Sequence, residues 1–175
     1  METVLILDFG AQYSQLIARR VREQNVYCEV KPCSISPAEI EKIAPIGIIL
    51  SGGPQSVYES VSPHVDPALF ALGIPVLGIC YGCQLMAYSL GGTVAAATEA
   101  TAREYGKTLT EFDTDCSIFQ GLPASSVTWM SHGDYISQVP DGFAVTAKTA
   151  VCPTAAMACP EKKLYGVQFH PEVQH

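Results

Sequence analysis

The sequence predicts a three-layer α/β fold, in which a mostly parallel central sheet is covered by helices and extended by antiparallel strands. Over residues 1–90, short and almost wholly apolar runs alternate with segments of helical spacing, as expected for parallel strands buried on both faces. From Thr93 onward, polar residues interrupt the apolar runs, which is typical of antiparallel strands added to the sheet. No repeat or linker divides the chain, so we expect a single domain over residues 1–175.

Four apolar runs predict the parallel strands, at residues 3–8, 26–30, 46–50 and 75–79. The predicted helices are residues 12–23, residues 37–43, a short helix near 66–72, and residues 81–90. Leu16, Ile17 and Val21 have the spacing of one helix face. Pro37 suits a first helical turn, where its missing N–H costs nothing, and Gly91 ends the last helix. The predicted antiparallel part comprises the runs 106–112, 127–130, 144–148 and 155–159, followed by a last strand at 164–169.

Composition and charge disfavour several classes of protein. Hydrophobic residues make up 48% of the chain and charged residues 15%, which is too apolar for a disordered protein. With 10 Lys and Arg against 17 Asp and Glu, the net charge of −7 argues against binding to the phosphate backbone of nucleic acids. No apolar run is long enough to span a membrane, and the first residues lack the basic and apolar regions of a signal peptide. We therefore expect a soluble, cytoplasmic protein that does not contact a membrane.

The cysteines and histidines give two further expectations. Seven cysteines, an odd number, without a secretory signal predict free thiols in a reducing compartment. No two of the four histidines lie at the spacing from a pair of cysteines that is typical of a zinc finger, so we expect no metal site.

The most informative local feature is the segment Gly78-Ile79-Cys80-Tyr81-Gly82, between a predicted strand and a predicted helix. Two flanking glycines permit the tight strand-to-helix turn that lifts a nucleophile off a sheet. At a helix N-terminus, unpaired N–H groups and the helix dipole favour a thiolate. Cys80 is therefore the candidate nucleophile. The alternatives are a buried structural cysteine and, because Cys83 completes a C-x-x-C spacing, a thioredoxin-like redox pair.

A candidate base follows the last predicted strand. His170 can accept the thiol proton and later protonate a leaving group, while Glu172 can bind the other imidazole nitrogen and fix the tautomer. Pro171 stiffens the link between them. Alone, this His-Pro-Glu segment is equally compatible with a solvated loop, but together with Cys80 it predicts a nucleophile–base–orienter set.

A third feature, Ser51-Gly52-Gly53-Pro54, also lies at the carboxyl end of a predicted strand, where ligands bind in doubly wound sheets. A phosphate-binding loop is disfavoured, because Pro54 has no N–H and no Lys-Ser/Thr pair follows. We predict instead an oxyanion hole formed by the N–H groups of Gly53 and Tyr81.

Together these segments resemble the three signatures of class I glutamine amidotransferases, in the right order, and the resemblance covers essentially the whole chain. Segments 6–13, 52–58, 103–106 and 129–134 are more specifically similar to the GMP synthetase branch of that family. The resemblance implies that Cys80, His170 and Glu172 are the catalytic triad. It also implies a glutamine pocket formed by Gly52, Gly53, Gln55, Gln84, Ser131, Gly133 and Asp134. His132 is open to two interpretations, a second base or a structural element of this pocket.

The resemblance further implies a flavodoxin-like fold and hydrolysis of glutamine without a metal or redox cofactor. The ammonia would be used by an ATP pyrophosphatase partner that aminates XMP to GMP, with ATP and Mg²⁺ bound only there. Two departures are Cys83, where the family usually has Met, and the end of the sequence at His175, which predicts a fragment or a separate subunit. The alternatives are an amidotransferase serving anthranilate, CTP or carbamoyl phosphate synthesis, and a non-catalytic glutamine-binding regulatory module.

Overall fold

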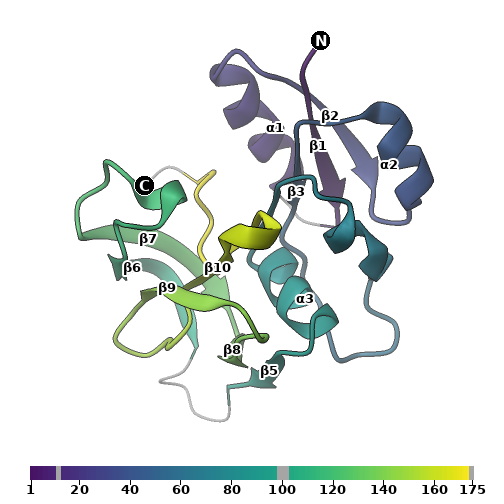
Figure 1. Ribbon diagram of the computed structural model, residues 1–175. Coiled ribbons are helices and arrows are strands. Elements are labelled where there is room, and N and C mark those ends of the chain that lie inside the picture. The colour runs from purple at the N-terminus through teal and green to yellow at the C-terminus, as the bar shows by residue number, and fades with distance from the viewer. Residues whose placement is uncertain (11–12, 98–102, 174–175) are drawn as a thin grey trace.

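The computed structural model describes residues 1–10, 13–97 and 103–173 (Figure 1). Its strands are β1 (Thr3–Asp8), β2 (Tyr27–Pro32), β3 (Gly47–Leu50), β4 (Val76–Ile79), β5 (Thr93–Ala96), β6 (Glu104–Phe112), β7 (Ser125–His132), β8 (Asp134–Gln138), β9 (Ala144–Lys148), β10 (Ala156–Cys159) and β11 (Leu164–Val167). The α-helices are α1 (Ser14–Glu23), α2 (Pro37–Ile43) and α3 (Tyr81–Ser89). Short 3₁₀ helices are η1 (Pro67–Ala71), η3 (Ser117–Phe119) and η4 (Pro160–Lys162).

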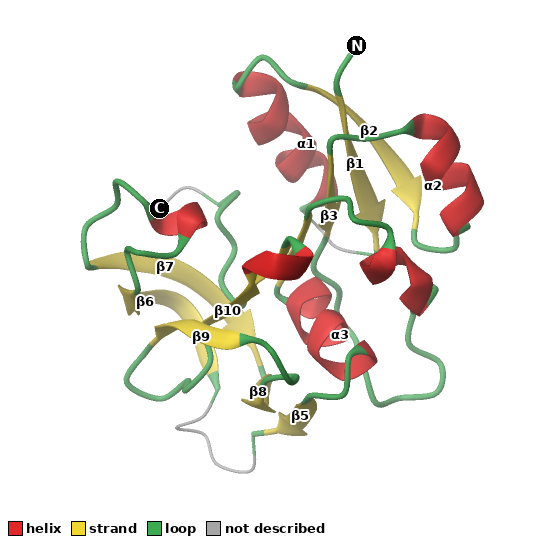
Figure 2. Ribbon diagram, in the orientation of Figure 1, coloured by secondary structure: helices red, strands yellow, loops and turns green. Residues whose placement is uncertain are grey.

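Within the described residues, one nine-stranded sheet has the order β2-β1-β3-β4-β11-β10-β9-β6-β7. The pairs from β2 to β11 are parallel, and those from β11 to β7 are antiparallel. Figure 2 shows the α-helices α1, α2 and α3 gathered around the parallel part and the antiparallel strands curving away from it. The predicted α/β fold, a parallel sheet with an antiparallel extension, is therefore confirmed.

The parallel part of the sheet is buried on both faces. Successive side chains of a strand point to opposite faces, and Ile6 of β1 belongs to a different core cluster from its neighbours Leu5 and Leu7. Ile17 of α1 packs with Ile6, whereas Leu85 of α3 packs with Leu5 and Leu7. The helices thus cover the sheet from both sides, which explains the nearly uninterrupted apolar sequence of these strands.

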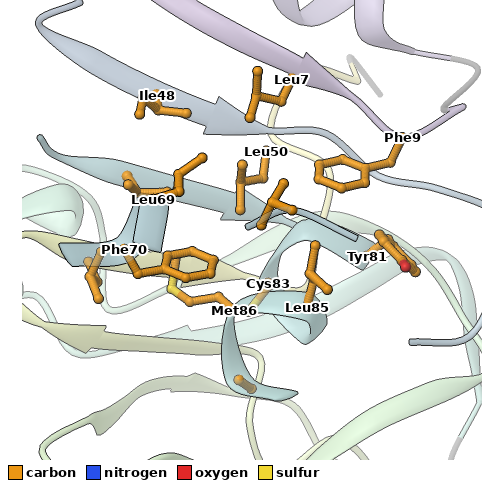
Figure 3. Close-up of a cluster of buried hydrophobic side chains, with 14 of the residues drawn as sticks. Leu7, Phe9, Ile48, Leu50, Leu69, Phe70, Tyr81, Cys83, Leu85 and Met86 are labelled. Atoms are coloured by element: carbon orange, nitrogen blue, oxygen red, sulfur yellow. The ribbon is translucent and has the colours of Figure 1, made fainter. Parts of the chain in front are cut away.

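Figure 3 shows the cluster beneath α3, where Leu7 and Leu50 from the strands face Leu85 and Met86 from the helix. Cys83 lies among them and is fully buried. All seven cysteines are free thiols, as predicted.

Several element boundaries differ from the predictions. The first helix begins at Ser14, and Gln12 lies outside the described residues. The segment near 66–72 forms the 3₁₀ helix η1, in which the Asp66 side chain accepts a hydrogen bond from the N–H of Ala68. The last strand ends at Val167, two residues earlier than predicted, because the N–H of His170 bonds to the carbonyl of Trp129 on another strand.

The strands β6 and β7 are longer than predicted, and two strands were missed. The pairing of β6 with β7 continues from Glu104 opposite His132 to Glu111 opposite Ser125, because backbone hydrogen bonds do not require apolar side chains. The strands β5 and β8 form a separate antiparallel ribbon, in which Ala96 lies opposite Asp134. Their sequences lack the alternation of a half-buried strand.

The three sequence signatures meet at one edge of the parallel sheet. The strands β3, β4 and β11 are neighbours in the sheet and run in the same direction. Ser51 directly follows β3, Cys80 directly follows β4, and His170 lies three residues beyond the end of β11. Their carboxyl ends therefore bring the three segments together, at the edge where ligands bind in open α/β sheets.

Candidate active site

Cys80 occupies the turn between β4 and α3 in a strained backbone conformation. Its φ of 53° and ψ of −108° lie in a region that residues other than glycine rarely adopt. Its N–H bonds to the carbonyl of Val167 at 2.8 Å, which anchors the turn to β11. The side chain is 6% exposed and lines the pocket described below. This is the geometry of a nucleophile elbow.

The glycines on either side of Cys80 are required by close packing. A Cβ atom on Gly78 would lie 2.6 Å from the carbonyl oxygen of Gly82, and one on Gly82 would lie 2.5 Å from the carbonyl oxygen of Leu50. Both distances are shorter than real Cβ contacts, so any larger side chain would push α3 away from the sheet. The two glycines let the first turn of α3 sit directly on β3 and β4.

His170 and Glu172 form a buried pair beside Cys80. The Nδ1 atom of His170 lies 3.3 Å from each carboxylate oxygen of Glu172, so the other ring nitrogen, Nε2, is left to face the thiol. The exposed fractions are 7% for His170 and 3% for Glu172. The ring of Tyr13 contacts the imidazole edge-on, with 5.8 Å between ring centroids. A Nδ1–carboxylate distance of 3.3 Å is longer than the usual 2.9 Å, as is common in catalytic sites without substrate.

The electrostatics of this group favour an ion pair. Burial lowers the pKa of His170, but its hydrogen bond to Cys80 and its contact with Glu172 outweigh burial and raise the pKa to about 10. The imidazole is therefore protonated at neutral pH, and its positive charge lies beside the sulfur of Cys80.

The predicted oxyanion donors lie close together. A Cβ on Gly53 would lie 3.0 Å from the carbonyl of Phe9 and 3.3 Å from the Tyr81 ring, so the loop after β3 passes closely over the start of α3. Ser51 fixes this loop by accepting a hydrogen bond from the N–H of Phe9 at 3.1 Å. In the part of the chain that the structure describes, no hydrogen bond occupies the N–H of Gly53 or of Tyr81. Both donors are available to an oxyanion near Cys80.

A pocket of about 520 Å³ opens beside Cys80. It contains six of the residues assigned to glutamine binding or the oxyanion hole, namely Gly53, Gln55, Gln84, Ser131, Gly133 and Asp134. A cavity of about 340 Å³ shares Cys80 and Gly53 with it and adds Gly52 and His170. The structure thus brings all of these residues to one site.

Among the described residues, the acid that lines the pocket is Asp134. Its carboxylate accepts hydrogen bonds from the hydroxyls of Ser56 and Tyr58, the latter at 3.0 Å. The carbonyl of the preceding Gly133 accepts from the N–H of Ala97 at 3.0 Å, which ties this wall to the end of β5. The acid is therefore held at a defined position for a cationic group of a ligand.

His132 is a structural element of this wall rather than a base. Its Nδ1 bonds to the carbonyl of Asp134 at 2.8 Å, and its Nε2 bonds to Glu104 at 2.9 Å. The second oxygen of Glu104 accepts from the hydroxyl of Thr149 at 2.7 Å. Both ring nitrogens are occupied by these hydrogen bonds, so neither is free to accept a proton from a ligand in the pocket.

Glu104, His132 and Cys152 together have the residue types of a metal site, with their ligand atoms within 4.8 Å of one another. Two ligands of one tetrahedral zinc ion lie about 3.3 Å apart, given metal–ligand bonds of about 2.0 Å. The Glu104–His132 separation of 2.9 Å is instead that of a hydrogen bond, and Cys152 bonds to the carbonyl of Thr154. In this arrangement Glu104, His132 and Cys152 form hydrogen bonds that support the protein structure.

Cys83 does not share the pocket with Cys80. Its sulfur packs against Gly166 of β11, where an added Cβ would lie 2.5 Å away, and burial raises the pKa of the Cys83 thiol. A neutral thiol beneath the helix does not favour the redox pair considered from the sequence.

Three contacts of the predicted triad residues could not be predicted from the sequence. Gln168 is fully buried and donates to the sulfur of Cys80, Tyr13 contacts His170, and Arg20 bonds to the backbone of Glu172. Of these three residues, only Gln168 could have been noticed in the sequence, as a polar residue inside the apolar run of the last predicted strand. The contacts of Tyr13 and Arg20 depend on where α1 lies relative to the end of the chain.

Comparisons with known proteins agree with this geometry. A family model described as "Glutamine amidotransferase class-I" matches residues 5–175. GMP synthase [glutamine-hydrolyzing] from Clostridium botulinum (strain Alaska E43 / Type E3) is 56% identical over 174 residues, which are 99% of this chain and 33% of that protein. The protein of the same name from Caldanaerobacter subterraneus subsp. tengcongensis is 59% identical over the same shares. The chain therefore spans a third of the length of these relatives.

Among solved structures, that of a putative GMP synthase protein from Thermoplasma acidophilum has a TM-score of 0.85 with this chain. The two are 31% identical, and the match covers 100% of this chain and 86% of the other.

Proposed function

Because the chain belongs to the class I glutamine amidotransferase family, we propose that it hydrolyses glutamine to glutamate and ammonia through a thioester on Cys80. The observation that carries the proposal is the buried set of Cys80, His170 and Glu172 at the edge of a polar pocket.

In the first half-reaction, the thiolate of Cys80 attacks the side-chain amide carbon of glutamine and forms the S–C bond. The carbonyl oxygen takes up the negative charge and accepts hydrogen bonds from the N–H groups of Gly53 and Tyr81. His170 then donates its Nε2 proton to the nitrogen as the C–N bond breaks and ammonia leaves.

In the second half-reaction, the now neutral His170 accepts a proton from water, and the hydroxide adds to the thioester carbonyl. Collapse of this intermediate breaks the S–C bond, releases glutamate and restores the thiolate–imidazolium pair. Glu172 keeps the Nδ1 proton of His170 in place throughout and stabilises the imidazolium.

The pocket is suited to the amino-acid end of glutamine. The carboxylate of Asp134, fixed by Ser56 and Tyr58, matches the charge of the α-ammonium group. Gln55, Ser131 and Gly133 line the same wall and offer the backbone and amide groups that orient a polar substrate.

The ammonia is used, in this proposal, to aminate XMP to GMP on an ATP pyrophosphatase domain or subunit, where ATP and Mg²⁺ bind. The support is the 56% and 59% identity to two proteins named GMP synthase, of which this chain matches one third. That level of identity favours GMP synthesis over anthranilate, CTP or carbamoyl phosphate synthesis. The complete set of thiol, imidazole and carboxylate argues against a regulatory module that only binds glutamine.

The remaining assignments follow from this function. The glutaminase chemistry needs no metal or redox cofactor, and neither nucleic acid nor a membrane is a partner. We assign the protein to the cytoplasm. No helix among the described residues is long and apolar enough to cross a bilayer.

Ammonia release from glutamine tests the proposal directly. We expect release by the wild-type chain and none above background by Cys80→Ala, with a higher rate when a separately expressed synthetase domain, XMP and ATP are added. GMP formation by that mixture, measured by chromatography, tests the acceptor. Equal ammonia release by wild type and Cys80→Ala would contradict the glutaminase. Glutaminase activity that never yields GMP would contradict only the acceptor.

A further inference from the structure

Gln168 is a buried polar side chain that the mechanism above does not use. It follows β11 directly and is 0% exposed. Its Nε2 atom lies 3.4 Å from the sulfur of Cys80, and its Oε1 atom lies 3.1 Å from the Nε2 atom of Gln84 on α3. A fully buried amide in contact with a nucleophile requires an explanation, because burying it costs free energy unless its groups are hydrogen-bonded.

The orientation of the Gln168 amide follows from its neighbours. The backbone carbonyl of Asp134 can only accept hydrogen bonds, so the atom of Gln84 that lies 3.1 Å from it is the NH₂ group. The same NH₂ group faces Gln168, which must therefore present its oxygen to Gln84. The remaining NH₂ group of Gln168 is then directed at the sulfur of Cys80.

We propose that Gln168 is a further catalytic residue, which donates an N–H to the sulfur of Cys80 and stabilises the thiolate together with His170. Gln84 is the positioning residue that orients the Gln168 amide, through its own hydrogen bond to the Asp134 carbonyl. The proposal rests on the proposed function, since the sulfur is a reacting atom only if Cys80 is the nucleophile.

The sulfur needs a second donor for two reasons. The carbonyl oxygen of Ser131 lies 3.6 Å from it, which suits a neutral S–H group but repels a thiolate. Two titratable groups among the described residues, His170 and the buried Cys83, have pKa values that Cys80 raises. Burial keeps Cys83 neutral, so Cys83 supplies no stabilising charge.

Gln168 also differs from His170 in that it exchanges no proton during the cycle. His170 loses its proton to ammonia in the first half-reaction and carries no charge until it deprotonates water. An amide N–H does not titrate, so Gln168 remains a donor when the S–C bond breaks and the sulfur becomes negative again. Gln168 therefore donates to the thiolate beside the imidazolium whenever the sulfur is negative, without taking part in the proton transfers.

Alkylation of Cys80 by iodoacetamide tests, without glutamine, whether Gln168 stabilises the thiolate. The thiolate displaces iodide, so the rate against pH reports the fraction of thiolate. Mass spectrometry of the Cys80 peptide separates Cys80 from the other six cysteines. Gln168→Met keeps a similar side-chain volume and removes the donor. We expect this variant to move the midpoint of the alkylation rate–pH curve upward by about one pH unit, as for the loss of one hydrogen bond to a charged group.

Gln168→Glu provides a second variant that keeps the hydrogen bond from Gln84. It places a carboxylate oxygen against the sulfur, so we expect a larger upward shift than for Gln168→Met. Gln120→Met, at an exposed position, is the matched control and should leave the midpoint unchanged. Melting curves identify a variant that does not fold, in which case the other variant decides the result.

Loss of the Gln168 donor should affect kcat and KM for ammonia release differently. Gln168 does not belong to the residues that line the pocket, so kcat for ammonia release should fall about tenfold for Gln168→Met, with KM nearly unchanged. Wild-type midpoints in both folded variants would overturn the role of Gln168. A wild-type protein with a reactive Cys80 that releases no ammonia would overturn the proposed function instead.

Discussion

Arg20 donates from its Nε atom to the backbone carbonyl oxygen of Glu172 at 3.0 Å. This bond joins α1 to the segment that carries the carboxylate of the proposed triad. Arg20 is itself oriented by Glu23 through two contacts of 3.0 and 3.1 Å. The position of Glu172 therefore depends on a helix at the other end of the sequence.

Arg20→Ala should lower kcat because it releases the backbone of Glu172. A displacement of 1 Å near a reacting centre costs about 10²-fold, so we expect a loss of about tenfold for a partial displacement. The measurement is ammonia release at saturating glutamine. Arg19→Ala, on the exposed face of the same helix, is the matched control and should retain the wild-type rate. Equal rates in the two variants would show that Arg20 does not position Glu172.

Glu172→Gln should preserve the fold and remove most of the activity. The amide of glutamine can stabilise the wrong tautomer of His170 and cannot balance the imidazolium charge. By comparison with serine-type triads, the loss can reach about 10⁴-fold, although a thiolate–imidazolium pair depends less on its third member. Circular dichroism verifies the fold, and single-turnover ammonia release gives the rate. Unchanged hydrolysis would remove Glu172 from the mechanism.

The pKa of His170 makes the stability depend on pH. The folded-state pKa of about 10 lies above the ordinary value of 6.5, so the folded state binds the proton more tightly than the unfolded state. The resulting stabilisation is complete below about pH 6.5 and is lost as the pH rises through about 10. Urea midpoints between pH 6 and pH 10.5 should therefore decrease in wild type more steeply than in His170→Ala. Parallel curves for the two proteins would contradict the assignment.

The sequence alone predicted the three side chains of the proposed triad, because each lies in a short segment next to a strand end. It could not locate the contacts that support them. Gln84 and Gln168 are 84 residues apart, and Glu104 and His132 are 28 residues apart. Such pairs depend on strand order and register, and the sheet order β3-β4-β11 places the late strand β11 beside the early strand β4. The ribbon of β5 and β8 was missed because its two strands lack the alternation of a half-buried strand.

The Glu104–His132 pair should control the shape of the pocket wall. Glu104→Ala removes the partner of the His132 ring and with it the support of the Asp134 carbonyl. We expect faster deuterium exchange in peptides covering residues 131–134, and a KM for glutamine raised about tenfold, with a smaller change in kcat.

Glu104→Gln separates hydrogen bonding from charge. Its NH₂ group can donate to Nε2 of a neutral His132, and its oxygen can accept from Thr149, so every bond is retained. We expect exchange and KM close to wild type. Glu111→Gln, an exposed position on the same strand, is the control. A Gln variant as impaired as the Ala variant would show that the charge, not the hydrogen bonding, shapes the wall.

A diazo-ketone analogue of glutamine should modify Cys80 alone. The analogue carries the amino-acid end that the pocket is proposed to bind, and Cys80 is the cysteine that lines this pocket in the described residues. Cys83, one turn along α3, is fully buried against Gly166, and burial keeps its thiol protonated. Intact-mass measurement should show one adduct per chain, and peptide mapping should place it on Cys80.

Two variants test the recognition of the analogue. Cys83→Ala should be labelled at the wild-type rate, whereas Asp134→Asn should be labelled about tenfold more slowly, because it loses the charge that attracts the α-ammonium group. Labelling at Cys83, or labelling that is spread over several cysteines and insensitive to Asp134, would mean that the pocket does not recognise glutamine in the way the structure suggests.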